Sequence, residues 1–149
     1  MAVRVIVDQH IARPPADVAA FATDPANDTR WIGALQSARK LTAGPFGIGT
    51  QVERTASFLG RKIEYVLEIA GLEVGRKVEM RSIKAPFPMT VTYAFEPDGD
   101  GTRMSIETGG DASGFYALAA PLLSIQVKRG VAGDLKRLKQ ILESAADSS

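Results

Sequence analysis

The side chains of this sequence that could hold a small molecule are polar residues spaced along predicted strands. On the strand faces that we expect to be buried, they are Gln9, Arg54, Tyr65, Ser82, Tyr93 and Thr108. A buried polar group needs a hydrogen-bond partner. These groups therefore either pair with the backbone and with water or fix the orientation of a bound molecule. The assignment depends on the predicted strand register, because a shift of one residue would place all side chains of a strand on the opposite face.

Arg54 is the most specific of these candidates. If its side chain points inward, the guanidinium group can pair with an anionic group of a ligand, such as a carboxylate. The alternative is a surface arginine at an irregularity of its strand. The sequence leaves both interpretations open.

Large apolar side chains of the predicted strands and of the predicted C-terminal helix could form the body of a pocket. The candidates are Phe58, Met80, Met89, Met104, Leu118 and Leu122. Methionine suits this role because its side chain adapts its shape, although ordinary core packing is the alternative for each residue. The single tryptophan, Trp31, is expected either to be structural or to lie at the mouth of the cavity.

Composition excludes or disfavours several other kinds of site. The chain has no cysteine and a single histidine, His10, so thiolate nucleophiles and cysteine-based zinc sites are excluded. His10 is predicted on the outer face of its strand, and no spaced set of carboxylates forms a metal site. Gly109 and Gly114 have the spacing of a phosphate loop, but phenylalanine and tyrosine follow them instead of lysine and serine or threonine. We therefore expect no metal and no cofactor.

Length and charge set the class of protein. The chain has 149 residues, of which 45% are hydrophobic, and 18 basic residues stand against 17 acidic ones. We expect a single domain over residues 1–149 with a real core and no general attraction for nucleic acid. No run of apolar residues is long enough to span a membrane, and the first residues lack the features of a signal peptide. The prediction is a soluble, cytoplasmic protein.

Periodicity predicts the elements that position the candidate side chains. Residues 3–11 alternate as a strand with one buried face, which the prolines at 14 and 15 end. Two short helices follow, one from Pro15 and one around 25–30. Alternating segments separated by turn signals, such as Asp98-Gly99-Asp100-Gly101, then predict six strands in an antiparallel meander.

Residues 115–145 are predicted to form one long helix. Its apolar positions are three, four or seven residues apart, and they are Tyr116, Leu123, Val127, Val131, Leu135, Leu138 and Leu142. Gly130 and Gly133 are unusual inside a helix, where each costs about 1 kcal/mol relative to alanine. Either the sheet approaches closely at these glycines or the helix bends there.

One long helix must cover the apolar face of about seven strands. A flat sheet would leave its flanks exposed, so the sheet must curl around the helix and leave space between them. Cavities lined by apolar groups are the default ligand sites of proteins. We therefore predict an α+β fold in which a seven-stranded curved antiparallel sheet wraps around a long C-terminal helix, with two short helices after the first strand.

Four motifs occur in order along the chain: IARPPADV at 11–18, FATDPANDTRW at 21–31, TRMSIE at 102–107 with Gly114 after it, and LKRLKQILE at 135–143. With the order of the elements, these motifs resemble the START-like, or helix-grip, superfamily (SRPBCC), which includes the polyketide cyclase/dehydrase and birch-pollen-allergen groups. The resemblance covers nearly the whole chain and implies an internal cavity. Similar proteins bind sterols, lipids, polyketides, hormones, quinones or flavonoids; some are cyclases, and many are not catalytic.

Three hypotheses for function follow. The first is binding of a small hydrophobic ligand such as a lipid, sterol or polyketide, with transport or sequestration as its purpose, by a monomer or homodimer. The second is an enzyme of the polyketide cyclase/dehydrase type, in which Tyr65, Tyr93 and Arg54 polarise a carbonyl; it lacks a general base unless a buried carboxylate serves. The third is an interaction module that uses a second apolar face of the long helix, formed by Leu118, Leu122 and Ile125.

Overall fold

The sheet has seven antiparallel strands in the order β1-β7-β6-β5-β4-β3-β2. The computed structural model describes residues 2–58, 60–111 and 120–147. The strands are β1 (Ala2–Ile11), β2 (Leu35–Lys40), β3 (Gln51–Phe58), β4 (Arg61–Glu73), β5 (Lys77–Lys84), β6 (Met89–Asp98) and β7 (Gly101–Asp111). The predicted meander is therefore confirmed, and β1 pairs with the last strand, β7, from Ala2↔Asp111 to Ile11↔Thr102.

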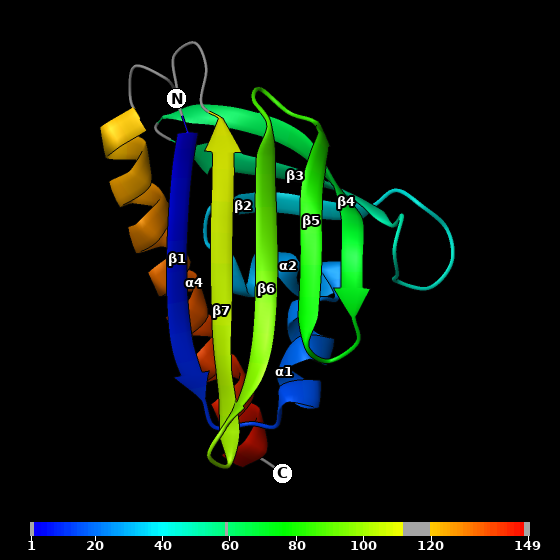
Figure 1. Cartoon of the computed structure of the whole chain (residues 1–149), viewed down its shortest axis with the longest axis vertical. Coiled ribbons are helices and arrows are strands. Elements are labelled where there is room, and N and C mark those ends of the chain that lie inside the picture. Colours follow the sequence, from blue (N-terminus) through cyan, green and yellow to red (C-terminus); the bar gives the residue numbers. More distant parts are fainter. Residues whose placement is uncertain (1, 59, 112–119, 148–149) are drawn as a thin grey trace.

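The sheet curls strongly, as the sequence predicted. Figure 1 shows β2 and β3 running nearly across the direction of β1 and β7. Register shifts interrupt the β2–β3 ladder between Leu35 and Ser37 and the β4–β5 ladder between Ile69 and Gly71. Extra residues at such bulges bend a strand and increase its local twist, which gives the sheet its concave face.

Two short helical segments follow β1, and they match the predicted pair. Helix α1 (Pro15–Ala22) begins with proline at its first position and buries Val18, Ala19 and Ala22. The second segment is a 3-10 turn, η1 (Pro25–Asn27), continued by one turn of helix, α2 (Asp28–Trp31). It brings Asp28 and Trp31 into the interior, where both are buried.

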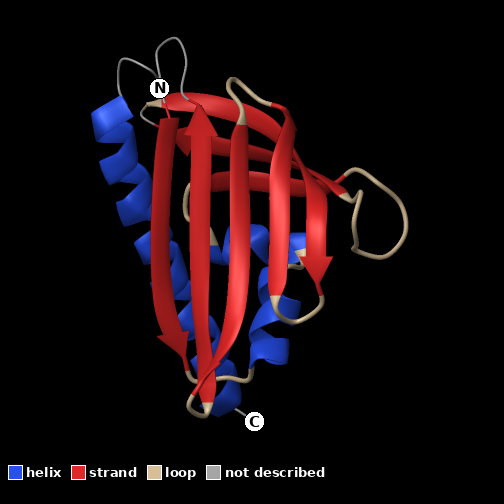
Figure 2. Ribbon diagram, viewed as in Figure 1, coloured by secondary structure: helices blue, strands red, loops and turns tan. Residues whose placement is uncertain are grey.

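The long helix α4 (Ala120–Asp147) lies on the concave side of the sheet and packs against β1 (Figure 2). Among the α4 side chains that the structure describes, the buried ones are four leucines at helical spacing, Leu123, Leu135, Leu138 and Leu142, as the periodicity predicted. The predicted start of the helix, with Tyr116, lies outside the described residues. Among the described helices, none has the combination of length and apolar character that crossing a membrane requires.

The apolar core is divided into two clusters. The larger one joins α1, Trp31, the strands and the C-terminal half of α4. The smaller one surrounds Leu123, near the start of α4, and includes Val3, Ile63, Phe87 and Val127. All five residues of the smaller cluster also line a cavity, so this space separates the two parts of the core.

Candidate ligand-binding cavity

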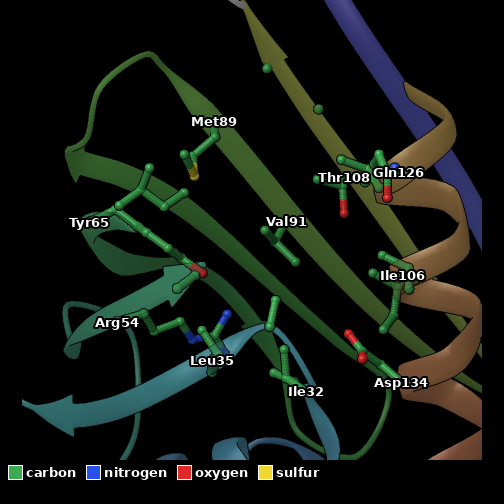
Figure 3. Close-up of a pocket in the computed structure, with 18 of the residues that line it drawn as sticks. Ile32, Leu35, Arg54, Tyr65, Met89, Val91, Ile106, Thr108, Gln126 and Asp134 are labelled. Carbon is green, nitrogen blue, oxygen red and sulfur yellow. The ribbon is translucent and has the colours of Figure 1, made fainter. Parts of the chain in front are cut away.

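A cavity of about 200 Å³ lies between the concave face of the sheet and α4 (Figure 3). Apolar side chains make up most of its wall. The lining residues are Val3, Trp31, Ile32, Ala34, Leu35, Arg54, Ala56, Ile63, Tyr65, Phe87, Met89, Val91, Tyr93, Ile106, Thr108, Gly109, Gly110, Leu123, Gln126, Val127, Gly130, Val131 and Asp134. This pocket lies where the sequence predicted a space between sheet and helix, and its role as a ligand cavity stays a prediction.

Simple periodicity builds most of this wall. Alternate residues of one strand face the same side of a sheet, so β6 presents Met89, Val91 and Tyr93 to the cavity. On α4, the lining residues recur every three or four positions along one stripe, from Leu123 to Asp134. Gln126 and Gly130 in this stripe are exposed to solvent, so the cavity opens beside α4.

Arg54 points inward and already has a carboxylate partner within the chain. Its Nε and Nη2 atoms donate to Oδ2 of Asp28 at 3.2 and 2.9 Å. The exposed fractions of the two side chains are 7% and 3%, so the surface alternative for Arg54 is wrong. Burial raises the pKa of Asp28, and the guanidinium group of Arg54 opposes this shift. Because arginine stays charged, its guanidinium group forms a buried ion pair with Asp28.

Tyr93 extends this buried pair. The Arg54 Nη2 atom lies 3.5 Å from the Tyr93 hydroxyl oxygen. Burial raises the pKa of Tyr93 to about 12, so the hydroxyl keeps its proton at neutral pH. Arg54 and Tyr93 line the cavity and also a second void of about 10 Å³, which Asp28 lines from the other side. Arg54 therefore presents a charge to the cavity that Asp28 balances from behind.

Asp134 is the carboxylate of the cavity wall. Its Oδ1 atom accepts hydrogen bonds from the Gly33 backbone N–H at 2.9 Å and from Arg137 Nη1 at 3.4 Å. Arg137 also donates to the Trp31 carbonyl oxygen at 2.7 Å, so α4 fixes the connection between α2 and β2. Burial raises the pKa of Asp134, and the hydrogen bonds from Gly33 and Arg137 oppose this shift.

Trp31 forms part of the wall from within the core. It is 1% exposed and meets Tyr93 edge to face, with ring centroids 5.7 Å apart. Its Nε1 atom is the one buried side-chain polar atom without a hydrogen-bond partner among residues 2–58, 60–111 and 120–147. Buried indole N–H groups usually have a partner, and this one is enclosed by the core and does not face the cavity.

The structure brings five of the predicted polar and aromatic site residues together at the cavity: Trp31, Arg54, Tyr65, Tyr93 and Thr108. Met89, one of the apolar candidates, joins them. These residues come from α2 and from strands β3, β4, β6 and β7. Their strand faces were predicted correctly, and their role in binding stays a prediction.

Other predicted site residues lie elsewhere. The Gln9 side chain donates to the His10 carbonyl oxygen, and the Ser82 hydroxyl accepts from the Met89 backbone N–H. Met80 lines the small void behind Arg54. The remaining candidates are Met104, fully buried in the core; Leu122, 51% exposed and not part of the wall; Leu118, outside the described residues; and Phe58, whose side chain is likewise outside the description.

Two functional candidates were missed from the sequence, Asp28 and Asp134. A signal for Asp134 was present, because it continues the apolar stripe of Val127 and Val131 with a carboxylate. Asp28 had no such signal, since its importance comes from a partner 26 residues away. His10 pairs instead with Asp98 at 2.9 Å, with half-exposed side chains, on the outer side of the sheet as predicted.

Residues 2–143 match the family described as polyketide cyclase / dehydrase and lipid transport. The chain belongs to this family. The match spans nearly all of the sequence, and it agrees with the helix-grip architecture, a curved sheet around a long C-terminal helix. No curated protein sequence matches the chain significantly.

Solved structures share the fold of this polyketide cyclase/dehydrase family member. TTHA0849 from Thermus thermophilus is 21% identical, with a TM-score of 0.82 over 97% of this chain and 99% of that one. The Zhui aromatase/cyclase from a Streptomyces species is 17% identical, with a TM-score of 0.80 over 96% and 94%. Ara h 8.0201 is also 17% identical, with a TM-score of 0.71 over 97% and 99%. At these identities the comparison concerns the fold alone.

Proposed function

We propose that this protein binds a compact, largely apolar small molecule in the cavity between the sheet and α4. The observation that carries the proposal is the division of the core by a space of about 200 Å³ with an apolar wall. Protein interiors are otherwise close-packed, with few voids larger than a water molecule. An apolar cavity with a few convergent polar groups is the usual form of a ligand site.

The volume limits the size of the ligand. Sites for drug-sized molecules usually measure about 300–1,000 Å³, so a space of about 200 Å³ suits a molecule of one or two rings or a short chain. A sterol or a long lipid would have to extend beyond the wall, through the opening beside Gln126 and Gly130. We therefore favour the smaller members of the ligand classes that the family description includes.

Polar groups would orient this ligand. Arg54 and Tyr65 extend into the space from the sheet, and Asp134 extends from α4 on the opposite wall (Figure 3). Directed hydrogen bonds of this kind fix orientation, whereas the apolar wall supplies most of the binding free energy.

Two measurements test the binding proposal. Native mass spectrometry of the purified protein should show a retained small molecule, and titration calorimetry of ligand-free protein should show saturable binding of 2-naphthol, a compact two-ring alcohol. Heats that do not saturate, together with a mass equal to that of the bare chain and flat thermal shifts across small apolar rings, would refute the proposal.

Asp134 also favours a second candidate, a cyclase/dehydrase-type enzyme. The sequence lacked a general base, and the structure provides a cavity-facing carboxylate whose pKa is raised by burial, which brings it closer to the range useful for proton transfer. Tyr65 and Arg54 on the opposite wall could polarise a carbonyl. Turnover of a short poly-β-ketone, lost in Asp134→Asn with folding unchanged, would favour this candidate; a bound but unreacted poly-β-ketone would exclude it.

A further inference from the structure

We propose that the cavity selects an uncharged ligand with a hydrogen-bonding end, such as a phenol, alcohol or amide, and rejects carboxylates and phosphates. This inference rests on the proposed binding function and names the chemical class of its ligand. It follows from how the charged groups of the wall, Arg54 and Asp134, are already paired.

The positive charge of the cavity wall is already paired within the protein. Among the described residues that line the cavity, Arg54 is the one cation. Two of its nitrogen atoms are bound to the Asp28 carboxylate, and both side chains are almost fully buried. An anionic ligand at Arg54 would compete with a fixed, preorganised carboxylate in the same low-dielectric interior. The expected pairing of Arg54 with an anionic ligand group is therefore replaced by an internal ion pair.

The negative charge of the cavity wall would repel an anionic ligand. Asp134 is the one acidic residue among the described residues of the lining, and its side chain reaches into the space opposite Arg54 (Figure 3). Its own cation, Arg137, lies on the outer side, with 46% of the side chain exposed, and it is not part of the wall. A ligand carboxylate inside the cavity would therefore meet Asp134 before any unpaired positive charge.

An uncharged ligand avoids both the competition with Asp28 for Arg54 and the repulsion by Asp134. Burying a charge without a partner is far more costly than burying a hydrogen-bonded neutral group. A hydroxyl or amide N–H can donate to Asp134, and a neutral acceptor can receive a hydrogen bond from the Tyr65 hydroxyl. The wall thus provides a donor and an acceptor, but no unpaired cation among its described residues.

A matched pair of probes tests this selectivity at neutral pH. The amide 2-naphthamide and the anion 2-naphthoate have the same ring system and nearly the same shape, and they differ in charge. Titration calorimetry should show that the amide binds at least about tenfold more tightly than the carboxylate. Equal or tighter binding of 2-naphthoate would overturn the inference while leaving the binding function intact. If neither naphthalene probe nor 2-naphthol binds, the proposed function itself fails.

Two variants locate the source of the selectivity. Asp134→Asn removes the negative charge of the wall but keeps an oxygen that can accept a hydrogen bond from the Gly33 N–H. The tenfold difference in affinity between 2-naphthamide and 2-naphthoate should therefore become smaller, because 2-naphthoate binds more tightly to this variant. Asp100→Asn makes the same charge change at an exposed position in the β6–β7 turn and should leave the affinity difference between the two probes unchanged. If the difference became equally smaller in both variants, the overall charge of the protein and not the cavity wall would set the preference for the amide, which overturns the inference. The wild-type comparison remains decisive if a variant fails to fold.

Discussion

Gly130 offers the sharpest test of the cavity, because it combines a helix position with open space. A Cβ atom built at Gly130 would meet no described atom within 4 Å, the neighbouring turns of the helix aside, and the same holds for Gly133. The close approach of the sheet that we considered for these glycines is therefore wrong. Gly130 lies on the cavity stripe of α4 and Gly133 does not, so the two positions form a matched pair.

The alanine variants should stabilise the protein equally. Replacing a glycine inside a helix by alanine gains about 1 kcal/mol, and for a chain of this size that raises the melting temperature by about 2–4 °C. We expect this shift from Gly130→Ala and from Gly133→Ala in calorimetric or urea unfolding. A loss of stability in either variant would contradict the open space around that residue.

Leucine variants of Gly130 and Gly133 should differ in ligand binding. Leucine is nearly as good a helix former as alanine, so both leucine variants should again be stabilised. At Gly130, however, four added carbon atoms, each about the size of a water molecule of ~30 Å³, occupy on the order of 100 Å³ of a cavity of about 200 Å³. Binding of 2-naphthol should weaken by about tenfold or more in Gly130→Leu and stay unchanged in Gly133→Leu. Wild-type affinity in Gly130→Leu would refute the placement of the ligand.

Three further predictions concern stability. Asp28→Asn leaves the buried charge of Arg54 without its partner and should cost about 3–5 kcal/mol in urea unfolding, so a loss below about 1 kcal/mol would contradict the buried pair. The pKa of Asp134 is raised in the folded state, so its contribution to stability is full below the ordinary aspartate value of about 3.9 and is lost as the pH rises through the folded value. The free energy of unfolding of wild type minus that of Asp134→Asn should therefore fall with rising pH in this window; a flat or rising difference would refute the direction of the shift. Leu122→Ala should change the free energy of unfolding by less than about 0.5 kcal/mol, because Leu122 is 51% exposed. Leu123→Ala should cost about 2–5 kcal/mol, because Leu123 is 3% exposed. Equal effects of the two variants would mean that α4 is rotated relative to the sheet.

The exposed apolar residues of α4 keep the interaction hypothesis open as a prediction. Leu122 and Ile125 are each 51% exposed, and Leu118 lies outside the described residues. Light scattering of Leu122→Glu against wild type tests whether this face joins two copies of the chain. A smaller particle in the variant would support the hypothesis, and identical masses at the monomer value would exclude this dimer face.

The sequence alone determined the architecture of this protein. Alternation in residues 3–11 and in the later segments specified strands, their short connections specified antiparallel hairpins, and the leucines of 135–142 specified a buried helix face. These are local patterns, and each one depends on the period of a single element. The sequence also predicted a space between sheet and helix, because one helix cannot cover the concave face of seven curved strands, but it did not decide whether side chains fill that space.

Only the tertiary structure decided the chemistry of that space. Met80 and Met89 lie on the inner face of adjacent strands, yet the Arg54 and Tyr93 side chains separate Met80 from the cavity that Met89 lines. Arg54 was a recognisable candidate, but its partner Asp28 comes from a different element, 26 residues earlier. The charge that a ligand meets depends on distances between elements, and these are set by sheet curvature and helix position, which no single stretch of sequence encodes.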